Sequence, residues 1–113
     1  MGSFSINVDK NTKIFYAEVE GTFSPEDGMK SLNAYKEAVS SITVPEYAID
    51  IDCTKLNVSA PDALPLLEAN FQQFKNDGFH QVTFRIAKNP ILKMQLSRVA
   101  RMVQMDKYEI IEQ

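Results

Sequence analysis

The side chains best suited to chemistry in this sequence are two aspartates, one histidine and one cysteine. Asp50 and Asp52 alternate with apolar residues, so they lie on the polar side of a predicted strand. Two carboxylates are a start toward a metal site or an acid/base pair, but a cation needs further oxygen ligands and proton transfer needs a positioned partner. His80 is the only histidine, and its spacing supplies no such partner. The pattern therefore predicts a solvated sheet face on a non-enzymatic protein, with no catalytic residue, metal or cofactor.

Composition and charge indicate one ordinary globular domain spanning residues 1–113. The net charge of -3 gives no overall attraction to nucleic acid. No apolar run is long enough to span a membrane, and the N-terminus lacks a signal-peptide pattern, so we expect a cytoplasmic protein. Cys53, the single cysteine, ends the apolar side of a strand. It is expected to be a buried, inert thiol.

The elements that would position these residues begin with a hairpin. Alternating apolar residues predict strands over residues 3–9 and 13–20, joined by a turn. A helix follows, with Ser24 as its N-cap, Pro25 at its first position and Asp27 reaching back toward the cap. Apolar residues at helical spacing predict its inner face: Met29, Leu32, Tyr35, Val39 and Ile42.

Residues 47–53 predict a central strand, followed by a helix that Ser59 would cap and Gly78 would end. A strand over residues 81–86, a helix starting at Pro90 and a strand over residues 107–112 complete the chain. The inner faces of the two later helices are predicted to carry Leu64, Leu67, Phe71 and Phe74, and Leu92, Leu96, Val99 and Val103.

Every predicted strand has one apolar and one polar face, which a sheet covered by helices on both sides would not show. We therefore expect an α/β fold. Its five-stranded sheet would be mostly parallel, with an N-terminal antiparallel hairpin and three helices on one face.

This order of elements resembles the STAS domain, the fold of bacterial anti-sigma-factor antagonists of the SpoIIAA type. When the strand-end aspartate of that family is placed on Asp52, Leu64 and Gly78 fall without gaps on the family's leucine and helix-closing glycine. The family's Asp-Ser-Ser-Gly turn is replaced here by residues 60–63, Ala-Pro-Asp-Ala. The regulatory serine falls on Pro61, which has no hydroxyl. The resemblance thus implies the scaffold and a protein partner, without the phosphoserine switch.

Two surfaces are candidates for partner binding. The first is the loop and helix start formed by Ser59, Ala60, Pro61 and Asp62. Ser59 is expected to be a structural cap, with phosphorylation as the alternative. The second is a basic face of the last helix, formed by Lys93, Arg98 and Arg101 in a stretch without acidic residues. Such a face suits an acidic protein partner or the acidic half of a second copy in a homodimer.

An alternative function is the binding of a small apolar or lipid-like ligand between the helices and the sheet. STAS-like folds are similar in architecture to lipid-carrier domains. The residues expected to line such a pocket are Phe15, Phe71, Phe74, Met94 and Met102. Aromatic and methionine residues at these spacings also suit an ordinary packed core.

Overall fold

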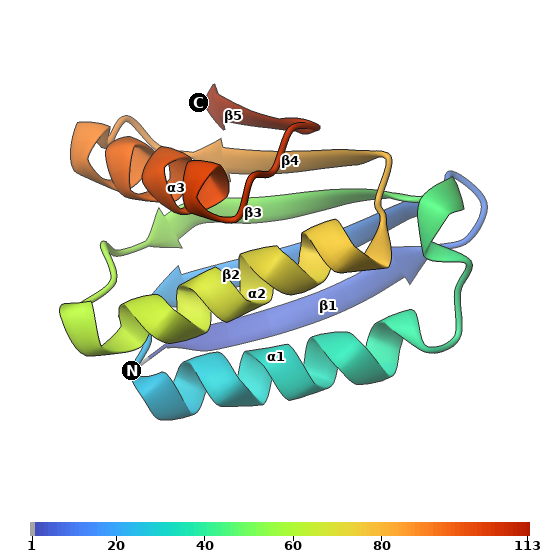
Figure 1. Cartoon of the computed structure of the whole chain (residues 1–113), viewed down its shortest axis with the longest axis horizontal. Coiled ribbons are helices and arrows are strands. Elements are labelled where there is room, and N and C mark those ends of the chain that lie inside the picture. Colours follow the sequence, from blue (N-terminus) through green and yellow to red (C-terminus); the bar gives the residue numbers. More distant parts are fainter. Residues whose placement is uncertain (1) are drawn as a thin grey trace.

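The computed structural model describes residues 2–113 and shows a sheet of five strands with helices along one face (Figure 1). The strands follow one another across the sheet in chain order, and β1 and β2 are antiparallel while all other neighbours are parallel. Their bounds are β1 Ser3–Asp9, β2 Ile14–Gly21, β3 Ala48–Leu56, β4 Gln81–Ile86 and β5 Tyr108–Glu112.

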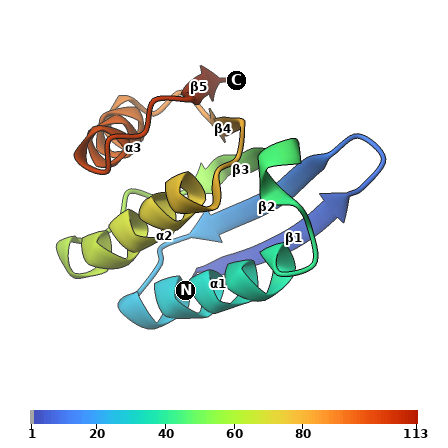
Figure 2. The same ribbon diagram turned by 45° about the vertical axis from the view of Figure 1, so that its right-hand side comes forward.

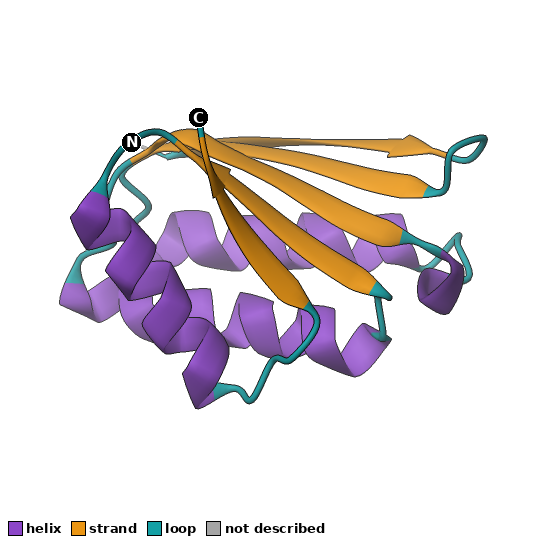
Figure 3. Cartoon of the chain, turned by 90° about the horizontal axis from the view of Figure 1, so that it is seen from above, coloured by secondary structure: helices purple, strands orange, loops and turns teal. Residues whose placement is uncertain are grey.

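The three α-helices are α1 (Pro25–Val39), α2 (Leu64–Asp77) and α3 (Pro90–Met102). Short 3-10 turns precede β3 (η1, Val44–Glu46) and α2 (η2, Pro61–Ala63). All three α-helices cover the same face of the sheet, as Figure 3 shows from above. Right-handed crossovers between neighbouring parallel strands place successive helices on one side, so the predicted fold class is confirmed.

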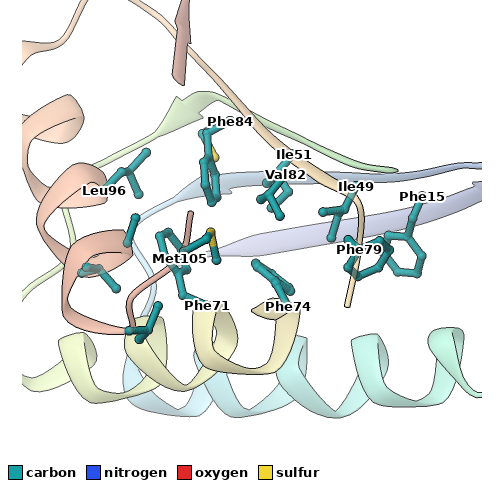
Figure 4. Close-up of a cluster of buried hydrophobic side chains, with 14 of the residues drawn as sticks. Phe15, Ile49, Ile51, Phe71, Phe74, Phe79, Val82, Phe84, Leu96 and Met105 are labelled. Atoms are coloured by element: carbon teal, nitrogen blue, oxygen red, sulfur yellow. The ribbon is translucent and has the colours of Figure 1, made fainter. Parts of the chain in front are cut away.

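The core lies between the sheet and the helices (Figure 4). Phe84 of β4 stacks on Phe71 of α2, with ring centroids 4.8 Å apart. Tyr35 of α1 packs edge-on against Phe74, and its hydroxyl donates a 2.6 Å hydrogen bond to Asp77. Burial and this acceptor raise the pKa of Tyr35. The buried residues of α3 are Leu92, Leu96, Val99 and Ala100, with Val103 just beyond its end.

The start of α1 is held by the predicted capping box. The Ser24 hydroxyl accepts from the Asp27 backbone N–H, and the Asp27 carboxylate accepts from the Ser24 N–H, both at 3.1 Å. Asp27 also accepts from the Gly2 N–H at 3.1 Å, which ties the start of the chain to this helix. These backbone donors, that of Ser24 first, lower the pKa of the buried Asp27 carboxyl.

The prediction that Met29 lies on the inner face of α1 was wrong, because its side chain is 48% exposed. The helix turns Gly28 inward instead, next to Asp27, Leu32 and Tyr35. A Cβ atom built on Gly28 would lie only 2.7 Å from the Cβ of Leu66 in α2. The close approach of two helices therefore decides which face is buried.

The α-helical part of α2 starts at Leu64, later than the predicted start at Ser59. Two prolines account for the difference. Ala60, the residue before Pro61, is extended, and Pro65 has no N–H to donate to the Pro61 carbonyl, so the Leu64 N–H closes a 3-10 turn there instead. Phe71 and Phe74 are buried as predicted, whereas Leu64 and Leu67 are only half-buried. Gly78 ends the helix at a φ of 88°, as expected for a closing glycine.

The helices of residues 2–113 are all too short or too polar to cross a membrane.

Candidate functional site

The loop between β3 and α2 is exposed at its tip and fixed at both sides. The Ser59 backbone N–H donates to the Gln95 side-chain oxygen at 2.9 Å, and the Gln95 amide donates to the Ser59 carbonyl at 3.0 Å. On one side, Asn57 donates its backbone N–H to Gly21 at 3.0 Å. On the other side Ala63 is buried, with 3% of its surface exposed. Residues 60–62 between these anchors are exposed.

The structure corrects the role predicted for Ser59. Its side chain caps no helix: the residue before η2 is Ala60, and neither η2 nor α2 has a side-chain cap. Ser59 instead acts through its backbone, which is paired with Gln95 of α3. Pro61 and Asp62 belong to the 3-10 turn, and Asp62 is fully outside the core. This end of the molecule is also where α1, α2 and α3 begin (Figure 1).

An apolar cavity of about 90 Å³ lies beneath this loop, between α1, α2 and the sheet. Phe71 and Phe74 line it as predicted, together with Gly28, Leu66 and Leu67. The other residues predicted for an apolar pocket lie elsewhere. Phe15 lines an adjoining cavity of about 60 Å³, which Phe74 also lines, and Met94 and Met102 are 60% and 58% exposed on the side of α3 next to α2. The residues predicted to line one apolar pocket are therefore distributed over three places.

The open face of the sheet carries the two aspartates of the central strand. Asp50 forms a bidentate ion pair with Arg85, whose side-chain nitrogens donate hydrogen bonds of 2.9 to 3.0 Å. The hydrogen bond to Asp50 raises the pKa of Arg85. Asp52 accepts from the Thr54 hydroxyl at 2.7 Å and from its N–H at 2.9 Å, and these bonds lower the pKa of Asp52. Within residues 2–113, no three His, Cys, Asp or Glu side chains are arranged to hold a metal ion.

The remaining chemical candidates lie apart from one another. His80 is exposed, and its backbone N–H donates to the Tyr47 carbonyl. Cys53 is 2% exposed, and burial raises the pKa of its thiol to about 12. A buried thiol with a raised pKa carries little thiolate, which fits the predicted inert role.

The three residues of the predicted basic face of α3 differ in their surroundings. Lys93 pairs with Glu112 of β5 at 2.7 Å. Arg98 lies about 140° further around the helix, on the side of α2, since each residue turns the helix by about 100°. It lines a groove between α2 and α3, whereas Arg101 does not. Within the described residues, neither arginine takes part in a salt bridge.

Comparison with known proteins bears on the fold. No protein-family model and no curated protein sequence matches this chain. A crystal structure of an uncharacterized protein of the DUF3478 family from Shewanella loihica, with a SpoIIAA-like fold, is similar to this chain with a TM-score of 0.71. The match covers 100% of this chain and 89% of that one. The fold is SpoIIAA-like. This confirms the scaffold expected from the resemblance to STAS domains, and at 17% sequence identity the SpoIIAA-like fold by itself assigns no function.

Sequence reasoning missed two features of the site. Gln95 was not singled out, because its partner Ser59 is 36 residues away in the chain. Ile91, Met94 and Met102 form an exposed apolar strip on α3. Their spacing of three and eight residues places them on one side of the helix, about 120° from the stripe of Leu92, Leu96 and Val99, so the helical pattern contained this signal.

Proposed function

We propose that this chain is a non-enzymatic, cytoplasmic protein-interaction module that contacts its partner through residues 59–62. The observation that supports this most directly is the exposed turn of Ala60, Pro61 and Asp62, held between the Ser59–Gln95 hydrogen bonds and the buried Ala63. A contact surface that is already ordered loses less conformational entropy when a partner binds. The SpoIIAA-like scaffold supplies the helices and strands that fix it.

The chemistry of the turn favours a partner with a positive or hydrogen-bond-donating surface. Asp62 takes part in no salt bridge within residues 2–113, so its charge is available to a partner. Pro61 restricts the backbone at the tip and has no group to phosphorylate. The proposed interaction is therefore constitutive at this position, in contrast to a phosphoserine switch.

Reversing the charge of Asp62 is expected to weaken partner binding about ten-fold or more, since opposite charges at an interface become like charges. Affinity capture from a lysate of the source organism, followed by mass spectrometry and titration of the captured protein, measures this. Asp106→Lys is the matched control, because Asp106 is equally exposed but lies after α3. A partner that binds the Asp62→Lys variant as tightly as the control would contradict the assigned surface.

The apolar cavity beneath the loop favours a second candidate function, binding of a small apolar ligand. Its volume of about 90 Å³ is smaller than the engineered cavity of about 150 Å³ that holds benzene. A larger, lipid-like molecule would require α1 and α2 to separate. Native mass spectrometry of the protein purified from its own host tests this, because a retained ligand adds mass to the 12.8 kDa chain. A clean apo mass would count against this function.

A further inference from the structure

A groove of about 250 Å³ runs along the surface between α2 and α3. The two helices lie side by side over the sheet in both ribbon views (Figures 1 and 2). On the α2 side the groove is lined by Leu64 and Glu68, and on the α3 side by Ile91, Met94, Arg98 and Met102. It is separate from the apolar cavity beneath the loop, which lies between α1, α2 and the sheet.

The α3 side of this groove carries three of the five large apolar side chains that are exposed among residues 2–113. Ile91 is 66% exposed, Met94 60% and Met102 58%, whereas the other two exposed apolar side chains of the described residues, Met29 and Tyr16, lie on α1 and β2. These three residues gather on one helix face, and contiguous exposed apolar side chains mark interaction surfaces. A partner that covers them would remove this surface from water.

The charges of the groove are of opposite sign on its two sides. Glu68 projects from α2 and Arg98 from α3, and neither takes part in a salt bridge within residues 2–113. A two-fold axis makes every contact twice, from each protomer to the other. A patch that holds one acid and one base on opposite sides is therefore complementary to itself. An acidic partner would satisfy Arg98 but would meet Glu68 as a like charge.

We propose that the groove between α2 and α3 is the interface of a homodimer, in which α3 of each protomer packs into the groove of the other. Ile91, Met94 and Met102 form the apolar centre, and Arg98 pairs with Glu68 of the partner subunit. The other two basic residues of α3 do not oppose this arrangement. Lys93 is paired with Glu112, and Arg101 lies outside the groove. The loop of residues 60–62 stays free, so the dimer is independent of the proposed partner contact.

The mass of the protein in solution tests the dimer. Sedimentation equilibrium of the wild type is expected to show twice the 12.8 kDa protomer at high concentration. Met94→Glu places a charge at the apolar centre of the interface and is expected to raise the dimer dissociation constant about a hundred-fold. The carboxylate loses its hydration there and competes with Glu68 of the partner subunit for Arg98, which lies four residues further along α3. Met29→Glu is the matched control, because it makes the same change at an exposed methionine of α1. It should leave the dimer unchanged.

A charge exchange identifies the geometry. Arg98→Glu and Glu68→Arg should each weaken the dimer about ten-fold or more, because each places two like-charged pairs across the axis. The double variant restores opposite charges and should recover the wild-type constant to within about three-fold. Lys36→Glu, a charge reversal on the exposed side of α1, should have no effect.

Three results would overturn the proposal. The first is a wild-type protein that remains monomeric at millimolar concentration. The second is a dimer dissociation constant that Met94→Glu leaves unchanged, and the third is a double variant that dimerises as weakly as the single variants. The circular dichroism spectrum of each variant should match that of the wild type, because none of the substituted side chains is buried in the core. Glu68 is half-buried at the groove, and the others are exposed.

Discussion

Replacing Phe84 by alanine is expected to lower the free energy of unfolding by about 3 to 5 kcal/mol. Phe84 lies in the middle of β4 with 1% of its surface exposed, and its ring stacks on Phe71 of α2. The substitution removes the contact that joins the sheet to α2 and enlarges the neighbouring cavity, which Phe84 also lines. Because domains of this size are stable by only about 5 to 15 kcal/mol, the variant should lose a large part of its stability.

Urea unfolding followed by circular dichroism measures this difference. Thr83→Ala is the control, because Thr83 immediately precedes Phe84 in β4 and lies on the open face of the sheet. It should change the stability by about 1 kcal/mol or less, as expected for a half-exposed strand position. Similar losses for both variants would mean that the two faces of β4 do not differ in burial as the structure has them.

Replacing Gly28 by valine is expected to destabilise the protein by about 1 to 3 kcal/mol, although glycine is the poorer helix former. A Cβ at this position would lie 2.7 Å from the Cβ of Leu66, so α1 and α2 must move apart. Both residues line the apolar cavity, and the same substitution should change its size. The thermal unfolding midpoint of the variant measures the cost.

Met29→Val provides the comparison, because it introduces the same side chain at the next position of α1, where the residue is exposed. Only the small helix-propensity cost of valine, about 0.5 kcal/mol, is expected there. A Gly28→Val variant as stable as the wild type would mean that the two helices are not in close contact at this crossing.

The parts of the structure that the sequence predicted are those set by neighbouring residues. The capping box needs only Ser24 and Asp27, and the end of α2 needs only a residue that accepts a positive φ, as Gly78 does. Alternation of apolar and polar residues identifies a strand and its buried face without knowledge of its neighbours. The fold class follows from these local signals together with the handedness of parallel connections.

The start of α2 also depends on neighbouring residues, but the predicted start at Ser59 was wrong. Ser59 and Pro61 suggested a capped α-helix, whereas Pro65 has no N–H for the Pro61 carbonyl, which leaves a 3-10 turn before α2. As a result the serine is available for backbone pairing with Gln95. The candidate contact surface still consists of residues 59–62. It is held in place by hydrogen bonds to α3, and not by a helix cap as predicted.

Other features depended on how the elements pack, which no local pattern specifies. The strands, the helices, most of the inner faces and the single-sided sheet follow from local patterns of residues. Helix packing, by contrast, turns Gly28 rather than Met29 inward, because the crossing with Leu66 leaves no room for a side chain. Met94 and Met102 remain exposed because the stripe of α3 that faces the sheet is a different one, formed by Leu92, Leu96 and Val99. The periodicity of a helix indicates which residues share a face, whereas the neighbouring helix or sheet determines which face is covered.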